Sequence, residues 1–203
     1  AWYVTEALQG LGAKPRLRPT EWLTPYSERF FDEAQESGNV HAFLLNLLRY
    51  IELCSRFDLP LEPRHRNALV ANLKRFQNGD GAFPAEGANL PDSAIALRLM
   101  QAADLIAGRQ ILAIARANED ATYGFRASLV GQSSSLEVLA AGVAIFAAFD
   151  ATAAYPHALL RTITACQHAN GGFGHRAGAV STLRDTYLAL FILKRLGFCP
   201  PSA

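Results

Sequence analysis

The chain has 203 residues, half of them hydrophobic and 18% charged, with a formal net charge of +1. This balance supplies a hydrophobic core and argues against disorder. The small net charge, without a cluster of lysine or arginine, gives no electrostatic support for a nucleic-acid partner. The longest nearly apolar run, residues 138–149, is shorter than the roughly 20 residues of a membrane-spanning helix, so no transmembrane segment is expected.

The cysteines, Cys54, Cys166 and Cys199, are far apart in the sequence and show no C-x-x-C spacing. We interpret them as reduced thiols and expect a cytoplasmic protein. The sequence starts at Ala1 without a methionine, which leaves open that the true N-terminus has been removed. We treat residues 1–203 as a single domain of helical hairpins, either complete or one lobe of a longer protein.

Nine helices are predicted in chain order, five of one kind and four of another. One kind is mixed in polarity, as in 64–76, where apolar residues fall on one face and basic residues elsewhere. The other kind is apolar almost all round, as in 136–149, and such a helix must be buried on every side. The mixed helices are 20–34, 64–76 and 156–166, and the others are 1–12, 40–57, 94–105, 136–149 and 186–197.

Three polar, glycine-containing turns connect these helices, and each turn closes with a phenylalanine. The phenylalanines are Phe83, Phe125 and Phe173, which lie 42 and 48 positions apart, as expected for one helical hairpin and a long loop. Helix caps are predicted at Asn39, Asp92, serines 133–135 and Asp185, and Gly12 and Gly197 are predicted helix stops. The middle turn implies a fourth mixed helix before it.

Alternating half-buried and fully buried helices predict an outer ring packed around an inner ring. The expected fold class is therefore all-α, with an α/α toroid built from repeated hairpins. Five hairpins, one of them without its outer helix, are few for a closed ring, so an open arc or a ring completed by another chain is also consistent with the sequence. An ordinary helical bundle is the simpler alternative.

The segment 166–173 (CQHANGGF), continuing to Arg184-Asp185-Thr186-Tyr187, resembles the repeat of protein prenyltransferase β subunits. It is also similar to the repeats of squalene and diterpene cyclases, and 77–83 is a weaker copy. The resemblance extends over residues 64–197. It implies the toroid fold and an isoprenoid substrate.

The catalytic positions of both families are altered here. In prenyltransferase β subunits a zinc-binding cysteine follows the aspartate by two residues, but Tyr187 takes that place after Asp185, so no metal site is expected and the cofactor is left unknown. In the cyclases an aspartate protonates the substrate, and Pro91 stands at its position. The neighbouring Asp92 remains a candidate acid, although a helix cap is the simpler interpretation.

Glu137 is the only charge in an otherwise apolar predicted helix. A buried carboxylate there would have a raised pKa and would be able to act as an acid, whereas a carboxylate in the first turn also favours the helix N-terminus. The candidate catalytic residues are therefore Asp92, Asp185 and Glu137.

Arg176 follows Gly-Gly-Phe by three residues, the spacing at which the resemblance places a diphosphate-binding arginine. The planar guanidinium suits phosphate because it binds two oxygens at once. A solvated loop arginine, or one paired with Asp185, is the alternative. The remaining candidate substrate-binding residues are His175, Arg184, Arg126 and Tyr187.

The leading hypothesis is an isoprenoid-handling domain that binds or converts an allylic isoprenoid diphosphate. The alternative is a non-catalytic helical-repeat scaffold that presents a surface to a protein partner.

Overall fold

The computed structural model describes residues 23, 39–79, 81–84, 87, 89–129 and 134–198. This part of the chain contains seven helices and four two-residue strands, which confirms the all-α class. No helix in these ranges is long and apolar enough to cross a membrane. The predicted helices 1–12 and 20–34 (apart from Leu23), Ser133 and Cys199 lie outside the described residues.

The contacts divide the chain into two units, which are described in turn. The first consists of Ala1–Gln77 with Arg98–Ala107, and the second of Asn78–Leu97 with Gly108–Ala203. Helix α5 (Leu90–Ala102) contributes its first turns to the second unit and its last turn to the first.

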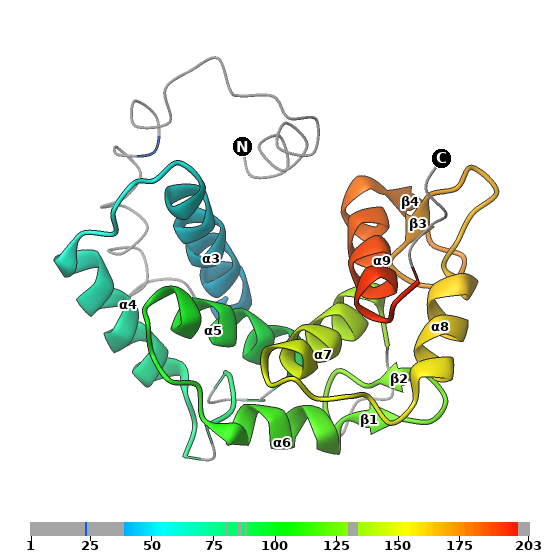
Figure 1. The fold of residues 1–203 in the computed structure, drawn as a ribbon, viewed down its shortest axis with the longest axis horizontal. Helices are drawn as coiled ribbons and strands as arrows, with labels where there is room; N and C mark the ends of the chain where they lie inside the picture. The colour runs from blue at the N-terminus through cyan, green and yellow to red at the C-terminus, as the bar shows by residue number, and fades with distance from the viewer. Residues whose placement is uncertain are drawn as a thin grey trace. The chain divides into compact units, whose positions relative to one another are not determined.

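The first unit contains α3 (Val40–Arg56) and α4 (Pro63–Phe76), drawn in blue and teal in Figure 1. Asn39 caps α3 as predicted, since its side chain accepts a hydrogen bond from the Ala42 N–H at 3.0 Å. The two helices pack through the rings of Phe43 and Phe76, whose centres lie 5.8 Å apart. Only three residues of α4 are buried, as expected for a helix of the mixed kind.

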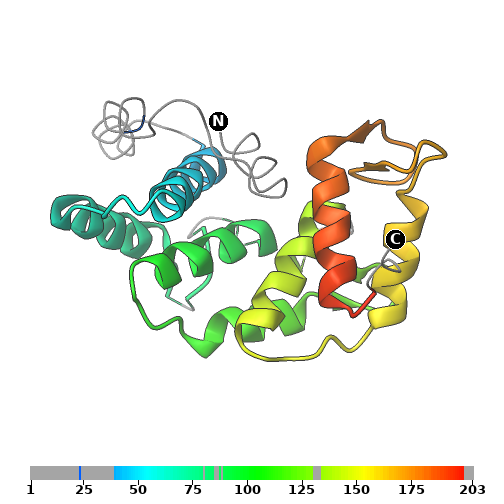
Figure 2. The same cartoon turned by 45° about the horizontal axis from the view of Figure 1, so that its top comes forward.

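The second unit contains four further helices, α6 to α9, with the first turns of α5 and both strand pairs. Helix α7 (Leu136–Ala148) is buried along almost its whole length, as predicted, and packs beside α9 (Leu183–Arg195), as Figures 1 and 2 both show. The other elements of the unit are α6 (Arg109–Ala117), β1 (Glu119–Asp120), β2 (Gly124–Phe125), α8 (Pro156–Ala165), β3 (Phe173–Gly174) and β4 (Ser181–Thr182). The strands form two antiparallel pairs, β1 with β2 and β3 with β4.

Two predicted helix starts were wrong by three or four residues. Helix α5 begins at Leu90 because Asn89, and not Asp92, is its cap: the Asn89 side-chain oxygen accepts from the Asp92 N–H at 2.9 Å. Helix α9 begins at Leu183 because the hydroxyl of Thr182 accepts from the Asp185 N–H at 3.0 Å. Both aspartates therefore lie in the first turn, where a carboxylate is favoured by the helix dipole.

The predicted repeat is visible in the hydrogen bonds of the second unit. The Asn78 N–H bonds to the Ala82 carbonyl, and the His168 N–H bonds to the Gly172 carbonyl in the same way, at 3.0 and 2.9 Å. The phenylalanine that follows each turn bonds to a hydroxyl on the next helix, Phe83 to Ser93 and Phe173 to Thr186. These bonds align the two turns residue by residue.

Successive repeats of the second unit are joined by a second kind of hydrogen bond. The first N–H of α5, at Leu90, donates to the Ala127 carbonyl at 3.0 Å, and the first N–H of α7, at Leu136, donates to the His175 carbonyl at 2.9 Å. Both acceptors lie two residues beyond the phenylalanine of the following turn. Helices α5 and α7 are thus each anchored at the start to the loop of the next repeat.

The four described helices of the apolar kind, α3, α5, α7 and α9, end in the same way. A residue with positive φ follows each end: Asp58, Asp104, Asp150 and Gly197. The next N–H in each case bonds back to a carbonyl five residues earlier, for example Ala151 to Phe146 at 2.8 Å. This is the six-to-one bond of the Schellman motif, and it confirms Gly197 as a helix stop.

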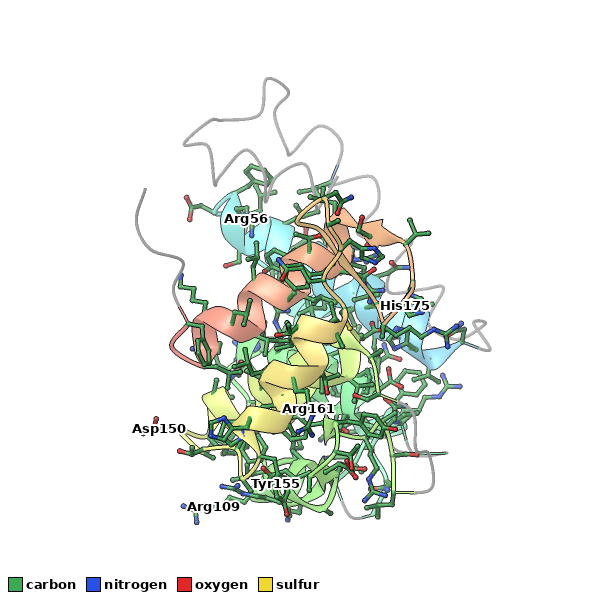
Figure 3. All side chains as sticks on the ribbon, turned by 90° about the vertical axis from the view of Figure 1, so that its right-hand side faces the viewer. Arg56, Arg109, Asp150, Tyr155, Arg161 and His175 are labelled. Carbon is green, nitrogen blue, oxygen red and sulfur yellow. The ribbon has the colours of Figure 1, made fainter. Side chains whose placement is uncertain are left out.

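Arginines of the mixed helices bind backbone carbonyls of neighbouring loops. In the first unit Arg66 of α4 donates to the Ala103 carbonyl at 2.6 Å. In the second unit Arg116 of α6 donates to the Thr152 carbonyl at 2.7 Å, and its guanidinium lies 4.5 Å from the ring centre of Phe146. Arg161 of α8, labelled in Figure 3, donates to the Thr122 carbonyl at 2.9 Å. Part of the basic character of these helices is therefore structural.

Candidate functional site

Two of the predicted site residues meet between α7 and α9. Glu137, in the first turn of α7, accepts a hydrogen bond from the guanidinium of Arg184, in the first turn of α9. The two side chains are 34% and 40% exposed, so Glu137 is not the buried acid considered from the sequence. The ion pair places a negative charge beside the guanidinium that Arg184 would offer to a diphosphate.

The loop between β3 and β4 presents His175 and Arg176 to solvent (Figure 3 labels His175). The loop is held at its base, because the His168 ring bonds to the Ala179 carbonyl and the Asn170 side chain donates to the Ser181 hydroxyl at 3.1 Å. Arg176 forms no ion pair with another described residue, and its exposed guanidinium is thus available to an anion.

Asp185, unlike Arg176, is buried. It is 4% exposed, and the Thr182 hydroxyl donates to its carboxylate at 2.6 Å. Asp185 lies near the Cys166 thiol, whose pKa is raised, first by burial and then by the negative charge of Asp185. A carboxylate held in this way stabilises the start of α9. Arg176 and Asp185, considered as a pair from the sequence, form no ion pair in the described part of the chain.

Asp92 occupies the equivalent place at the start of α5. It is 3% exposed and accepts a hydrogen bond from the Asn89 side chain at 2.7 Å. The aligned turns make Asp92 and Asp185 counterparts in two repeats, each buried in the first turn of its own helix. In both repeats the aspartate therefore has the same structural position, bonded to the residue that caps its helix.

Arg126 follows β2, and its Nε lies 3.5 Å from a carboxylate oxygen of Asp120 in β1. Tyr187 lies one turn after Arg184 on α9, and its side chain is 41% exposed. Of the three arginines proposed for a diphosphate, two therefore have carboxylate partners. No group of three or more histidine, cysteine, aspartate or glutamate side chains in the described part of the chain is placed to hold a metal ion.

Sequence reasoning missed an exposed apolar stripe along α9, which we call the α9 stripe. It consists of Val180, just before the helix, Leu183, Tyr187 and Leu190 on it, and Phe198 after it, with exposures of 82%, 73%, 41%, 51% and 48%. The spacing of four, then three, residues was readable in the sequence. The exposed residues were missed because helices of the apolar kind, including 186–197, were predicted to be buried on every side.

A second surface feature lies in the first unit. A polar-lined hollow of about 370 Å³ lies between α3 and the last turn of α5, where Arg98 is paired with Glu52. It is lined also by Ser55 and Gln101. Neither a nucleophile with a base nor a cluster of unopposed charges lies among these lining residues, so the hollow suggests no reaction.

No protein-family model matches the chain, and no curated protein matches it.

Proposed function

We propose that this chain is a helical-repeat domain that binds a protein partner through the α9 stripe. The observation that carries the proposal is a difference in burial at equivalent positions of α5, α7 and α9. The three helices align at their caps, Asn89, Ser135 and Thr182. The alignment permits a comparison position by position.

The first helical residue is Leu90, Leu136 or Leu183, and its exposure is 0%, 0% and 73%. Four residues on, Ala94 and Ala140 are 7% and 6% exposed, whereas Tyr187 is 41% exposed. Seven residues on, Leu97 and Val143 are 2% and 6% exposed, whereas Leu190 is 51% exposed. The positions that α5 and α7 bury are thus open on α9 while remaining apolar.

The side chains of the stripe are large, and the spacing of Leu183, Tyr187 and Leu190 places these three on one face of α9. Single exposed apolar residues are ordinary on a protein surface, but a contiguous apolar patch marks an interaction site. Burial of apolar area stabilises association by roughly 25 cal/mol per Å² before the entropy of association is subtracted. The stripe therefore supplies a driving force for binding a complementary apolar surface.

We also propose that the hairpins are arranged as an α/α toroid or an open arc of one. Helices of the apolar kind that are anchored to the loop of the following repeat suit an α/α toroid or an open arc of one. In either arrangement α9 is an inner helix, and its exposed face is the surface that a partner covers.

The three tyrosines Tyr123, Tyr155 and Tyr187 provide a matched test, since each is 41% exposed and only Tyr187 belongs to the stripe. A photo-cross-linking amino acid is placed at 187 or, as the control, at 155, in cells that make the protein. We expect a protein adduct from 187 and none from 155. Equal adducts from the two positions, or none from either, would contradict the proposal.

A second function, the binding of an isoprenoid diphosphate, is favoured by one observation. Arg176 and His175 are neighbours, both exposed, on a loop that is fastened at its base. Arginine and a protonated histidine both donate hydrogen bonds to phosphate oxygens. Titration calorimetry with farnesyl and geranylgeranyl diphosphate tests this function, and a lack of heat at high micromolar ligand would exclude it.

A further inference from the structure

The spacing of the α9 stripe indicates what covers it. Leu183, Tyr187, Leu190 and Lys194 follow one another at intervals of four, three and four residues. This is the spacing of a coiled-coil seam, in which one helix packs its stripe against the stripe of another. Val180 before the helix and Phe198 after it are also exposed. The complementary surface for such a seam is a second helix of similar length.

We propose that this second helix is α9 of another copy of the chain, packed antiparallel across a twofold axis. The proposal rests on the α9 stripe being a protein-binding surface, and it names the partner. In a twofold interface the same patch faces itself, so the patch must be complementary to itself. The α9 stripe meets this condition in one direction only.

In the antiparallel direction Tyr187 of one copy faces Leu190 of the other, and Leu183 faces Lys194. The long methylene chain of Lys194 covers Leu183 while its ammonium group reaches solvent. In the parallel direction Lys194 would face Lys194, and the like charges would repel each other. The charge pattern of α9 thus selects the antiparallel pair.

The size of the stripe fits a weak to moderate dimer. Leu183, Tyr187 and Leu190 share one face over the first two turns of α9, and Val180 and Phe198 are exposed before and after the helix. Two such surfaces together supply on the order of 1,000 Å², the lower end of specific interfaces. We therefore expect reversible dimerisation of the purified chain at micromolar concentrations.

Sedimentation velocity of the full chain from about 1 to 100 µM measures the dimer directly. Leu190→Glu places two carboxylates in the seam, and we expect it to weaken dimerisation by at least about tenfold. Tyr155→Glu, at a tyrosine of equal exposure outside the stripe, is the control and should dimerise like the parent chain. A parent chain that stays monomeric to 100 µM, or a Leu190→Glu variant that dimerises unchanged, overturns the proposal.

Cysteine pairs test the direction of packing. Leu183 and Lys194 lie about 16 Å apart along one helix, so antiparallel packing brings 183 of one copy to 194 of the other and keeps the two 183 positions apart. A thiol cross-linker of about 10 Å, one helix diameter, should join Leu183→Cys to Lys194→Cys in a mixture. The parent chain, which has its own cysteines, is the control. Cross-linking within Leu183→Cys alone would mean parallel packing.

These results separate the two proposals. If the purified chain is monomeric but residue 187 forms an adduct with another protein in cells, the stripe binds a partner and the second copy is wrong. If residue 187 forms no adduct and the chain is also monomeric, both proposals fail.

Discussion

The backbone N–H of Phe173 donates a hydrogen bond to the hydroxyl of Thr186, 3.0 Å away, and so connects the turn before β3 to the first turn of α9. Phe173 is 5% exposed, and its N–H would be buried without a partner if the hydroxyl were removed. We therefore predict that Thr186→Val lowers the free energy of unfolding by about 1–3 kcal/mol.

Thr186→Ser is the matched control, because it keeps the hydroxyl and removes only a methyl group. Urea unfolding of the two variants measures the difference. If Val and Ser at this position give the same stability, the bond between the turn and the helix contributes nothing and the repeat is held by packing alone.

Two substitutions at equivalent helix ends should change the stability of the fold in opposite directions, because the residue at each end has a positive φ. Asp150 has a φ of 51° and Gly197 a φ of 82°. Asp150→Gly should stabilise the fold by up to about 1 kcal/mol, because glycine adopts positive φ without steric cost. Gly197→Ala should destabilise it by about 1 kcal/mol, although a Cβ there would meet no atom within 4 Å.

Thermal unfolding of both variants checks this pair. Asp150 lies at the surface (Figure 3), so its side chain is not needed for packing. Opposite signs support a backbone origin, and destabilisation by both substitutions would mean that the Asp150 side chain itself stabilises the end of α7.

The Cys166 thiol predicts a dependence of stability on pH. Burial, and then the charge of Asp185, raise the pKa of Cys166 in the folded chain. The folded state therefore favours the neutral thiol, and this contribution is complete below the unfolded thiol pKa of about 8.5 and declines as the pH rises above it. Cys54 behaves in the same direction, because burial raises its pKa despite a hydrogen bond from Tyr50.

The measurement is alkylation by iodoacetamide at pH 8, followed at each cysteine by peptide mass mapping. Cys54 and Cys166 should react more slowly in the folded chain than in urea. Asp185→Asn should speed the reaction at Cys166 more than at Cys54. Fast alkylation of Cys166 in the folded chain would contradict its burial beside Asp185.

The exposed Arg176 tests the second candidate function. If the loop between β3 and β4 binds a diphosphate, Arg176→Ala should weaken binding of farnesyl diphosphate by about 1.5–3 kcal/mol, the range of a hydrogen bond to a charged group. Arg176→Lys should recover only part of the loss, because lysine keeps the charge but not the two-pronged geometry. Stability should change little, since Arg176 lies at the surface.

Calorimetry and thermal unfolding are carried out on the same variants. A loss of stability with unchanged binding would remove Arg176 from the candidate site. The paired Arg184 serves as a comparison, because Arg184→Ala removes the ion pair with Glu137 and should affect stability before it affects a ligand.

Much of the helical architecture could be predicted from periodicity, but the helix starts and the surface chemistry could not. The expected caps Asp92 and Asp185 are the residues that follow the real caps by three, and aspartate is favoured at either position. The aspartates at 58, 104 and 150 recur every 46 residues, and this period was readable in the sequence. Of the four described ends, only Gly197 was recognised as a helix stop.

The candidate site was predicted less well, because a sequence does not show which charges pair. Arg184 and Arg126 are the residue type expected to bind a diphosphate. Arg184, however, pairs with Glu137, which is distant in the sequence, and Arg126 pairs with Asp120 across the β1–β2 strand pair. The exposure of α9 was concealed for a related reason. Its composition is that of a buried helix, and only the packing of its neighbours shows that one face is open.

The central claim is that the α9 stripe serves binding and not folding, and Leu190→Glu tests it directly against Ile192→Glu on the same helix. Leu190 is 51% exposed and Ile192 is fully buried. Leu190→Glu should change the free energy of unfolding by less than about 0.5 kcal/mol, whereas Ile192→Glu should cost more than about 4 kcal/mol.

Adduct formation from a photo-cross-linker at position 187 is then measured in the Leu190→Glu background. We predict unchanged stability and loss of the adduct. A Leu190→Glu variant that loses as much stability as Ile192→Glu, or that forms the adduct undiminished, would contradict the account.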